Sequence, residues 1–288
     1  MTATSDPSSP APAPLRPADL VPPPVAIVPP PSTNRRFASY RTIAALILRE
    51  MSATYGRSPG GYLWMIVEPV LGIALLTAIF SAGFRTPSLG TNFAIFYATG
   101  LLPFQMYSAL QNNISSAVRY SRSLLAYPGV TFVDTLIARF VLTVLTQALV
   151  SFILISFIRA VYETQTVLEF STILQGYAMI ICIGTGIGLM NGFLFMRYEL
   201  WARVWAIVTR PLVFVSGVIL LVENIPKPYS EWLQWNPLVH AIARVRTGFY
   251  VHYSPPYIDE FYVYTVATVI GVVGMLFLSR HYRELLEI

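Results

Sequence analysis

Residues 172–196 read TILQGYAMIICIGTGIGLMNGFLFM, and this stretch contains no Asp, Glu, Lys or Arg. A helix that crosses a bilayer needs roughly 20 mostly apolar residues, because the hydrocarbon core is about 30 Å thick. Gly184, Gly188 and Gly192 recur every four positions, which places them on one face of such a helix. Small residues at this spacing let two helix backbones approach closely, so the stretch predicts a membrane-spanning helix with a closely packed glycine face.

The composition of the whole chain is typical of a membrane protein. Of its 288 residues, 55% are hydrophobic and only 11% are charged, whereas ordinary soluble domains carry about 25% charged residues. Other apolar stretches long enough to span a bilayer are about 62–81, 93–110, 130–157, 204–222 and 261–279. The sequence therefore predicts an all-α integral membrane protein with six transmembrane helices.

The segments outside these stretches have compositions of their own. Residues 1–34 are rich in Pro, Ala and Ser, which predicts a disordered cytoplasmic tail and not a signal peptide, ahead of a six-helix domain over 35–288. Residues 35–57 place apolar side chains at helical spacing among Arg and Glu, which favours an N-terminal interfacial helix over the start of a spanning helix. Residues 232–250 lie in a proline-rich segment, and they predict two short re-entrant helices before the last span, with an interfacial helix held by its tryptophans as the alternative.

The distribution of Arg and Lys predicts the orientation. If the N-terminus lies inside, the inner side carries 14 of the 19 basic residues and the outer side carries Arg85, Arg159, Lys227, Arg244 and Arg246. Cytoplasmic loops are enriched in basic residues. Both termini are therefore expected in the cytoplasm, which requires an even number of spans.

The sequence lacks the motifs of common enzymes. No GxxxxGK[ST] phosphate loop, HExxH or GxSxG motif occurs, so we expect no ATP hydrolysis and no catalytic residue in this chain. The one cysteine, Cys182, lies in an apolar stretch, and His240, His252 and His281 are too far apart in sequence to indicate a metal site by spacing. We therefore expect neither a metal nor a cofactor on this chain.

Charged side chains inside the predicted spans point to helix packing. Such charges are costly in a bilayer and usually have partners. Glu68 and Arg139 each lie about two helical turns from the inner end of a span, so we expect them to form a buried ion pair. Asp134 is the alternative partner of Arg139, or else it faces water at the inner side.

Two basic segments outside the spans are candidates for interactions. Residues 115–128 form a short inner segment, which is interpreted either as a helix that docks on a cytoplasmic partner through Leu124 and Leu125, or as a solvated loop. On the outer side, Arg244 and Arg246 add positive charge that would suit an anionic substrate.

Several short motifs occur in a fixed order along the chain. They are Leu48-Arg49-Glu50, Tyr55-Gly56-Arg57, Gly61-Tyr62-Leu63-Trp64, Glu68-Pro69, Thr99-Gly100-Leu101-Leu102-Pro103-Phe104, Arg122-Ser123-Leu124-Leu125-Ala126-Tyr127-Pro128 and Trp235-Asn236-Pro237-Leu238-Val239-His240. Together they resemble the capsular polysaccharide export permeases of the type-two ABC exporters, over about residues 40–288. One departure is Ala243, where many relatives carry an acidic residue, so no role of that acid is carried over.

The resemblance implies a multi-pass permease of the bacterial inner membrane, which works as a homodimer with a separate ABC ATPase that binds ATP and Mg. The implied substrate is a lipid-linked acidic capsular polysaccharide, and a periplasmic adaptor and an outer-membrane export component are implied partners. The ATPase-coupling residues implied are Arg49, Arg119, Tyr120, Arg122, Ser123, Leu124 and Leu125. The periplasmic gate residues implied are Trp232, Trp235, Asn236, Pro237, His240, Arg244 and Arg246.

A sugar polymer is polar, so it needs a passage through the hydrocarbon core, and aromatic walls can guide the apolar faces of sugars. The expected wall residues are Phe80, Phe84, Phe96, Tyr97 and Phe104. The alternatives to a capsule permease are a permease for O-antigen or teichoic-acid-type polymers, a membrane enzyme acting on lipid-linked sugars, and a non-transporting membrane scaffold.

Overall fold

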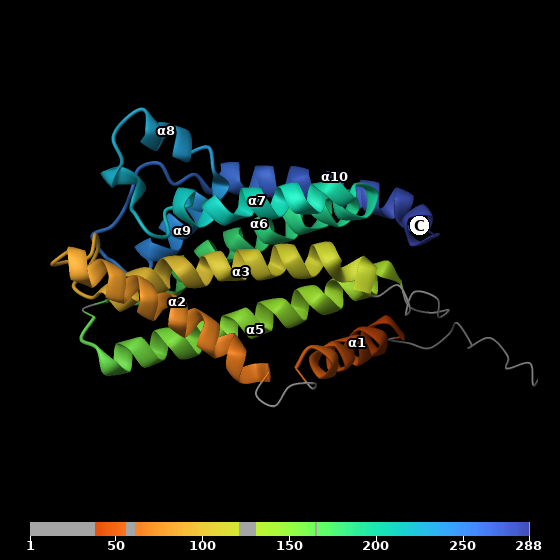
Figure 1. Cartoon of the computed structure of the whole chain (residues 1–288), viewed down its shortest axis with the longest axis horizontal. Coiled ribbons are helices and arrows are strands. Elements are labelled where there is room, and N and C mark those ends of the chain that lie inside the picture. The colour runs from red at the N-terminus through yellow and green to blue at the C-terminus, as the bar shows by residue number, and fades with distance from the viewer. Residues whose placement is uncertain (1–37, 56–60, 121–130, 165, 288) are drawn as a thin grey trace, which may run out of the picture. The chain divides into compact units, whose positions relative to one another are not determined.

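The long apolar stretches form helices, because a helix satisfies its backbone hydrogen bonds internally, as the interior of a bilayer demands. The computed structural model describes residues 38–55, 61–120, 131–164 and 166–287, and every regular element in these ranges is helical. Within these described ranges, five helices are long and apolar enough to cross a membrane. They are α2 (Gly61–Gly83), α3 (Phe93–Tyr120), α5 (Phe132–Val161), α6 (Phe170–Arg197) and α10 (Glu260–Glu287), shown in Figure 1.

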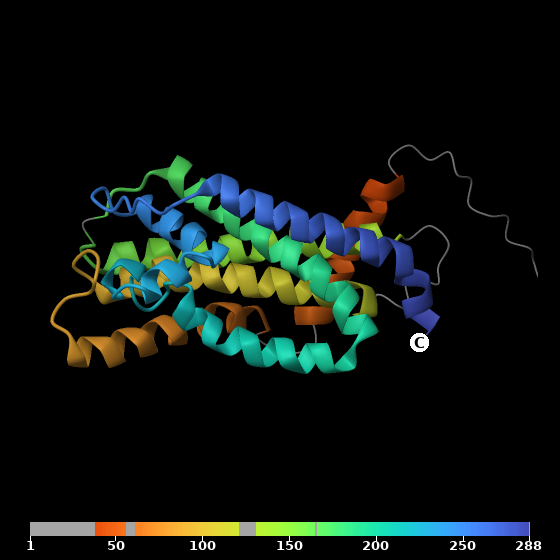
Figure 2. The same cartoon turned by 90° about the horizontal axis from the view of Figure 1, so that it is seen from above.

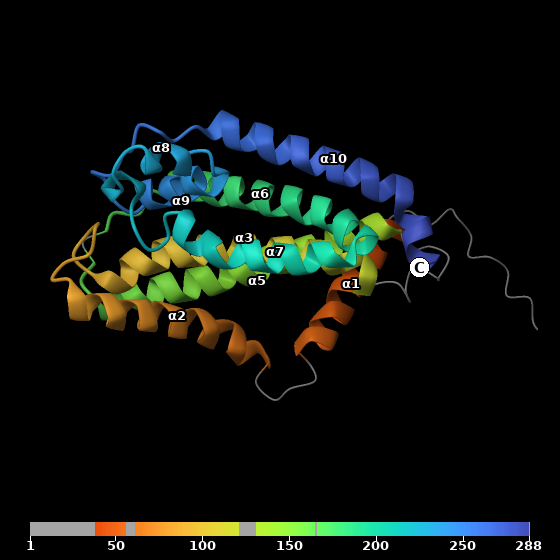
Figure 3. The same ribbon diagram turned by 45° about the horizontal axis from the view of Figure 1, so that its top comes forward.

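Helix α6 lies at the centre of the packing and contacts both α3 and α10 extensively (Figures 1 and 3). A Cβ added at Gly184 would lie 3.0 Å from Leu110 Cβ of α3, and one added at Gly188 would lie 2.9 Å from Ile114 Cβ. Toward α10, a Cβ at Gly186 would lie 2.5 Å from the carbonyl oxygen of Ala267. The glycines of α6 therefore let two neighbouring helices approach closely, and the predicted packing role of Gly184 and Gly188 is confirmed.

The segment predicted as the fifth span forms a shorter helix than expected. Helix α7 covers Glu199–Val215, whereas the prediction ran over 204–222. Its 17 residues extend about 26 Å at 1.5 Å per residue, somewhat less than the hydrocarbon thickness, and it is not among the five candidate spans. The chain turns at Gly217, whose φ of +75° is a conformation that glycine adopts without strain.

Three short helices connect α7 to α10. They are the 3₁₀ helix η2 (Val222–Asn224), α8 (Tyr229–Leu233) and α9 (Pro237–Thr247). Asn236 caps α9 by accepting a hydrogen bond from the Leu238 amide, and Pro237 occupies the first turn, where its missing N–H costs nothing. Most of α9 is buried against α6 and α3. The predicted break into two short helices near Pro237 is confirmed, and their entry into the outer leaflet stays a prediction.

Helix α1 (Ala38–Tyr55) forms where an amphipathic helix is predicted. Figures 2 and 3 show that it runs across the direction of the long helices, at the end of the bundle where α3 ends and α5 begins. The predicted tail over residues 1–34 lies outside the described residues, as does the segment 121–130.

Candidate functional site

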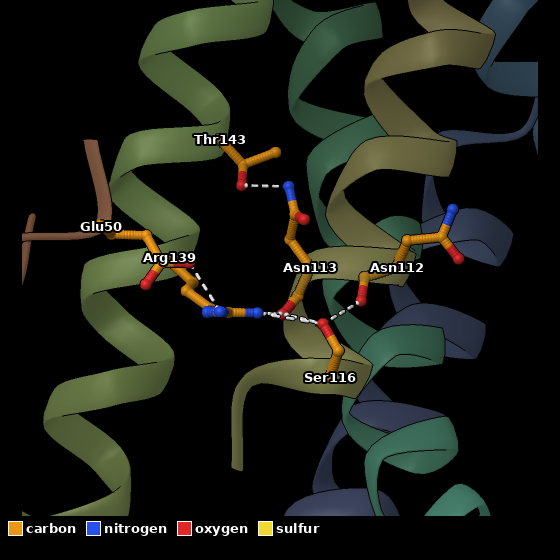
Figure 4. Close-up of polar contacts among 6 residues, drawn as sticks. All are labelled: Glu50, Asn112, Asn113, Ser116, Arg139 and Thr143. Carbon is orange, nitrogen blue, oxygen red and sulfur yellow. Dashed lines mark hydrogen bonds and ion pairs between the residues drawn. The ribbon is translucent and has the colours of Figure 1, made fainter. Parts of the chain in front are cut away.

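Arg139 joins three helices at the inner end of the bundle (Figure 4). Its Nη2 atom forms an ion pair of 2.6 Å with Glu50 Oε1 of α1. Its Nη1 atom donates hydrogen bonds to the Asn113 carbonyl at 3.3 Å and to Ser116 Oγ at 3.0 Å, both on α3. The Arg139 side chain is only 11% exposed, and a charge this far removed from water is tolerated because its two Nη groups have anionic and polar partners.

The surroundings of Arg139 are polar as well. Its guanidinium lies 5.0 Å from the centre of the Tyr120 ring, at a distance typical of a cation–π contact. Asn113 Nδ2 donates to Thr143 Oγ1 at 3.0 Å, which connects α3 to α5 one turn further along. A cavity of about 80 Å³ lies beside these residues and is lined by Gln147 as well as by Glu50 and Arg139. The cluster thus connects α1, α3 and α5 through polar contacts at one level.

The expected Glu68–Arg139 ion pair does not form. Glu68 is exposed on α2, next to the buried Pro69, so its side chain points away from the bundle, whereas Arg139 binds Glu50. The alternative partner, Asp134, caps α5: its Oδ2 accepts hydrogen bonds from the Thr131 amide at 3.0 Å and the Thr131 hydroxyl at 2.8 Å. Equal depth in two spans predicts a pair only when the two side chains face each other, and these do not.

This arrangement also removes the support for the membrane enzyme alternative. That alternative needs acidic or basic groups that converge at one bilayer depth, and the expected group was Glu68, Asp134 and Arg139. Glu68 is exposed and Asp134 serves as a helix cap. The three residues therefore do not form a reactive cluster.

Three of the seven expected ATPase-coupling residues lie in the described part of the chain, at the same end of the bundle as Arg139. Arg119 Nη2 donates to the carbonyl of Phe195 at 3.2 Å, which connects the inner ends of α3 and α6. Arg49 and Tyr120 are exposed. The remaining four, Arg122, Ser123, Leu124 and Leu125, lie outside the described residues.

Two tryptophans that the sequence reasoning did not single out attach α7 to the bundle. The Trp205 indole N–H donates to Gln111 Oε1 of α3, and the Trp201 indole donates to Asn191 Oδ1 of α6 at 3.0 Å. Gln111 and Asn191 are both buried polar residues. No local pattern in the sequence pairs these residues, because each Trp and its amide partner lie on different helices, and Gln111 and Trp205 are 94 residues apart.

At the outer end, Arg246 is buried and serves the fold. Its side chain is 1% exposed, its Nη1 donates to the Gly217 carbonyl at 2.6 Å, and its Nη2 donates to the Val218 carbonyl at 2.8 Å. Its guanidinium also lies 4.5 Å from the centre of the Phe96 ring. Both Nη groups of Arg246 thus bind the turn after α7, and the expectation that this arginine meets an anionic substrate stays a prediction.

The neighbouring expected gate residues also have partners within the chain. Arg244 pairs with Glu260 at 2.8 Å and donates to Gln175 Oε1 at 2.6 Å. His240 is buried; its Nδ1 accepts from the Asp259 amide at 3.1 Å, so Nε2 carries the proton that it donates to the Gln234 carbonyl at 2.6 Å.

Two tryptophans and two tyrosines lie in or near the short helices η2, α8 and α9. Trp232 and Trp235 are exposed at 64% and 75%. Tyr253 donates to Glu223 Oε1 at 3.0 Å and contacts Tyr257, and burial raises the pKa of Tyr257 to about 12. These phenols therefore stay protonated at neutral pH and act as hydrogen-bond donors beside Glu223.

The expected wall aromatics fall into different environments within one subunit. Phe84 is exposed, Phe80 and Phe104 are half-buried, and Phe96 and Tyr97 are buried. The Phe80 ring lies 6.0 Å from Phe84 and 5.5 Å from Tyr97 between centres, so these three form one aromatic row. Phe96 packs beneath Arg246 and Phe104 beside Tyr107, so the five side chains do not line one open passage in a single subunit.

Comparison with known proteins identifies the family of this chain. The model of the ABC-2 type transporter family matches residues 41–250. The polysialic acid transport protein KpsM of Escherichia coli is 31% identical over 219 residues, which cover 76% of this chain and 83% of KpsM. The capsule polysaccharide export inner-membrane protein CtrC of Neisseria meningitidis is 24% identical over 83% of this chain and 91% of its own length.

A third relative is the capsule polysaccharide export inner-membrane protein BexB of Haemophilus influenzae, which is 23% identical over 73% of this chain and 79% of its own length. The family match covers α1 to α9 and includes the Arg139 cluster, the Trp anchors of α7 and Arg246. Five candidate spans, an all-helical described part and these matches agree. The chain therefore belongs to the ABC-2 type transporter family as a membrane subunit.

Proposed function

We propose that this chain is the inner-membrane permease subunit of an ATP-driven exporter of lipid-linked, acidic capsular polysaccharide. The observation that carries the proposal is the match to KpsM over 83% of that protein, whose named cargo, polysialic acid, is an acidic polymer. CtrC and BexB, both named for capsule export, support the same cargo class.

The energy for export comes from a separate ATPase that binds ATP and Mg. The chain has no phosphate-binding loop of its own, and its family is that of transporters. The contact residues on this chain are Arg49, Arg119, Tyr120, Arg122, Ser123, Leu124 and Leu125. The Arg139 cluster supports this assignment, because α3 leads directly from Asn113 and Ser116 to Tyr120, which belongs to the coupling segment of residues 115–128.

The active form is a homodimer whose polymer passage lies between the subunits. Of the α7 residues, all of which the structure describes, none is buried, and α2 is mostly exposed although it is strongly apolar. Figure 2 shows α2, in orange, and α7, in teal, along the same side of the bundle. A second subunit that covers this side would bury the apolar residues of α2 and α7 and bring the row of Phe80, Phe84 and Tyr97 toward the passage. With α7 as a span, each subunit has six membrane helices.

The short helices before α10 form the periplasmic gate. Trp232 and Trp235 are its exposed members, while Asn236, Pro237, His240, Arg244 and Arg246 hold the gate helices on the bundle.

Both termini lie in the cytoplasm, and the first 34 residues form a cytoplasmic tail. A periplasmic adaptor and an outer-membrane component receive the polymer.

Deletion of the gene in its host tests this function. We expect surface polysaccharide to disappear and the polymer to accumulate inside the cell, with both restored by the wild-type gene. Complementation with Leu124→Asp should leave the protein in the membrane but not restore export, because an apolar anchor of the coupling segment is lost. A deletion strain that keeps its capsule and instead loses O-antigen or a teichoic-acid-type polymer would assign the chain to the other class of polymer exporter.

A further inference from the structure

A groove lies between α5 and α6, away from the residues discussed above. Its volume is about 490 Å³, within the usual range of pockets that bind small molecules. Met106 of α3 and Phe249, just after α9, contribute to the lining in addition to α5 and α6. None of the described residues that line the groove belongs to α2 or α7, so it is separate from the proposed dimer side.

The groove is at least as long as one leaflet of the hydrocarbon core is thick. On α5 its lining runs from Val144 to Arg159, which is about 22 Å of helix, and on α6 from Phe170 to Ile181, about 16 Å. Half of the hydrocarbon core is about 15 Å thick. Both stretches lie at the ends of α5 and α6 that the charge distribution assigns to the outer side, so the groove opens in the outer leaflet.

The chemistry of the lining changes along the groove. Most of its residues are apolar, including Phe152, Ile155, Leu174 and Ile181, and the polar members are a few hydroxyls and one arginine. That arginine, Arg159, lies in the last turn of α5, at the outer end, and is exposed. It has no ion-pair partner among the described residues.

An apolar groove inside a bilayer does not stay empty. A void forfeits the dispersion contacts of its lining, and water is unfavourable where so few polar partners are present. The surrounding solvent consists of acyl chains, which match this lining. Acyl chains alone give little selectivity, because lipid tails are about as apolar as leucine side chains. Selectivity must therefore come from Arg159, where a lipid headgroup would lie.

We propose that this groove is a binding site for an anionic phospholipid of the outer leaflet, with one acyl chain between α5 and α6 and the phosphate-bearing headgroup against Arg159. The lipid is a resident component of the membrane and not the cargo. It fills the space between α5 and α6, beside Phe249, and so supports the outer end of the bundle.

Photo-crosslinking in proteoliposomes tests this site. The probes are phosphatidylglycerol and phosphatidylcholine that carry the same diazirine-labelled acyl chain, and the readout is mass spectrometry of labelled peptides from the full chain. We expect phosphatidylglycerol to label peptides around Ile155 and Leu174 about fivefold more than phosphatidylcholine does, since one arginine near a membrane surface contributes about this factor. Arg159→Gln should reduce labelling by phosphatidylglycerol to the level of phosphatidylcholine, and Arg159→Lys should retain most of the preference.

Two further variants separate the groove from the general membrane surface. Arg85→Gln removes an exposed outer arginine that does not line the groove and should leave the labelling pattern unchanged. Ala148→Trp fills the groove and should lower labelling of its peptides by both lipids, while labelling of exposed α2 stays constant. Equal labelling by the two lipids in the wild type, or an unchanged preference in Arg159→Gln, would overturn the proposal. So would crosslinks from the groove to a second copy of the chain, which would identify a protein as the occupant.

Discussion

Arg139 and Arg246 lie at opposite ends of the bundle and are stabilised in different ways. Arg139 draws its partners from side chains and backbone of α1 and α3, including the carboxylate of Glu50. Arg246 binds two backbone carbonyls of the turn after α7 and packs on an aromatic ring, without a carboxylate in contact. The inner arginine connects separate long helices, whereas the outer arginine fixes one turn of the chain to the core.

The largest effect is expected at Arg246. Arg246→Met should lower the free energy of unfolding by about 3 kcal/mol or more, because the buried carbonyls of Gly217 and Val218 lose charged donors. The matched control is Arg244→Met, which removes a partly exposed ion pair and should cost only about 1 kcal/mol. Thermal unfolding of the detergent-purified protein measures both. Equal losses of unfolding free energy in the two variants would show that Arg246 contributes no more to the stability of the outer end than Arg244 does.

A smaller loss is expected where α6 meets α10. Gly186→Ala should destabilise the fold by about 1–3 kcal/mol, because the added Cβ would lie 2.5 Å from the Ala267 carbonyl oxygen and α10 would have to move. Gly83→Ala is the control, since nothing lies within 4 Å of a Cβ at that position. The same unfolding assay applies, and a Gly186→Ala protein as stable as Gly83→Ala would contradict the close packing of these helices.

The inner cluster should affect export more than stability. Glu50→Gln is expected to cost about 1 kcal/mol of stability, and a double-mutant cycle with Arg139→Gln should give a coupling energy of about 1 kcal/mol. Export should fall strongly in both single variants if α1 and α3 move together during transport. Glu68→Gln is the control, and it should change stability by no more than about 0.5 kcal/mol. Zero coupling between Glu50 and Arg139, or coupling of Arg139 to Glu68 instead, would contradict the structure.

The smallest expected effect concerns the cap of α9. Asn236→Ala should cost about 1 kcal/mol, because the Leu238 amide loses its acceptor, and Asn236→Asp should recover most of this loss. The unfolding midpoints of the two variants measure the difference. If Asn236→Asp were as unstable as Asn236→Ala, the side chain would act through its contact with Ser216 and not as a cap.

Much of the fold could be predicted because hydropathy and glycine spacing are local signals. The stretch 172–196 falls within α6, and the break at Pro237 separates α8 from α9, as expected. The end of α7 could not be predicted in this way, because residues 216–222 remain apolar after the helix stops. The turn there depends on Gly217 and on Arg246, which lies nearly 30 residues further along the chain.

The partners of the charged residues could not be predicted for the same reason. Counting along the sequence places Glu68 and Arg139 at similar depths, but the faces on which they lie are set by how α2 and α5 pack on α3. Glu50 was part of a motif that resembles the capsule permeases, yet nothing in its own segment indicates that it would reach Arg139. Long-range contacts of this kind depend on the arrangement of whole helices, which local periodicity does not specify.

In the proposed function, this chain forms a polymer passage that a separate ATPase drives. The most direct test uses inverted inner-membrane vesicles that contain the chain, its ATPase or both, supplied with ATP and a lipid-linked acidic capsular polysaccharide. We expect polymer to enter the vesicle lumen only when both proteins and ATP are present. Entry driven by the chain alone, or no entry of any polymer with both proteins present, would contradict it.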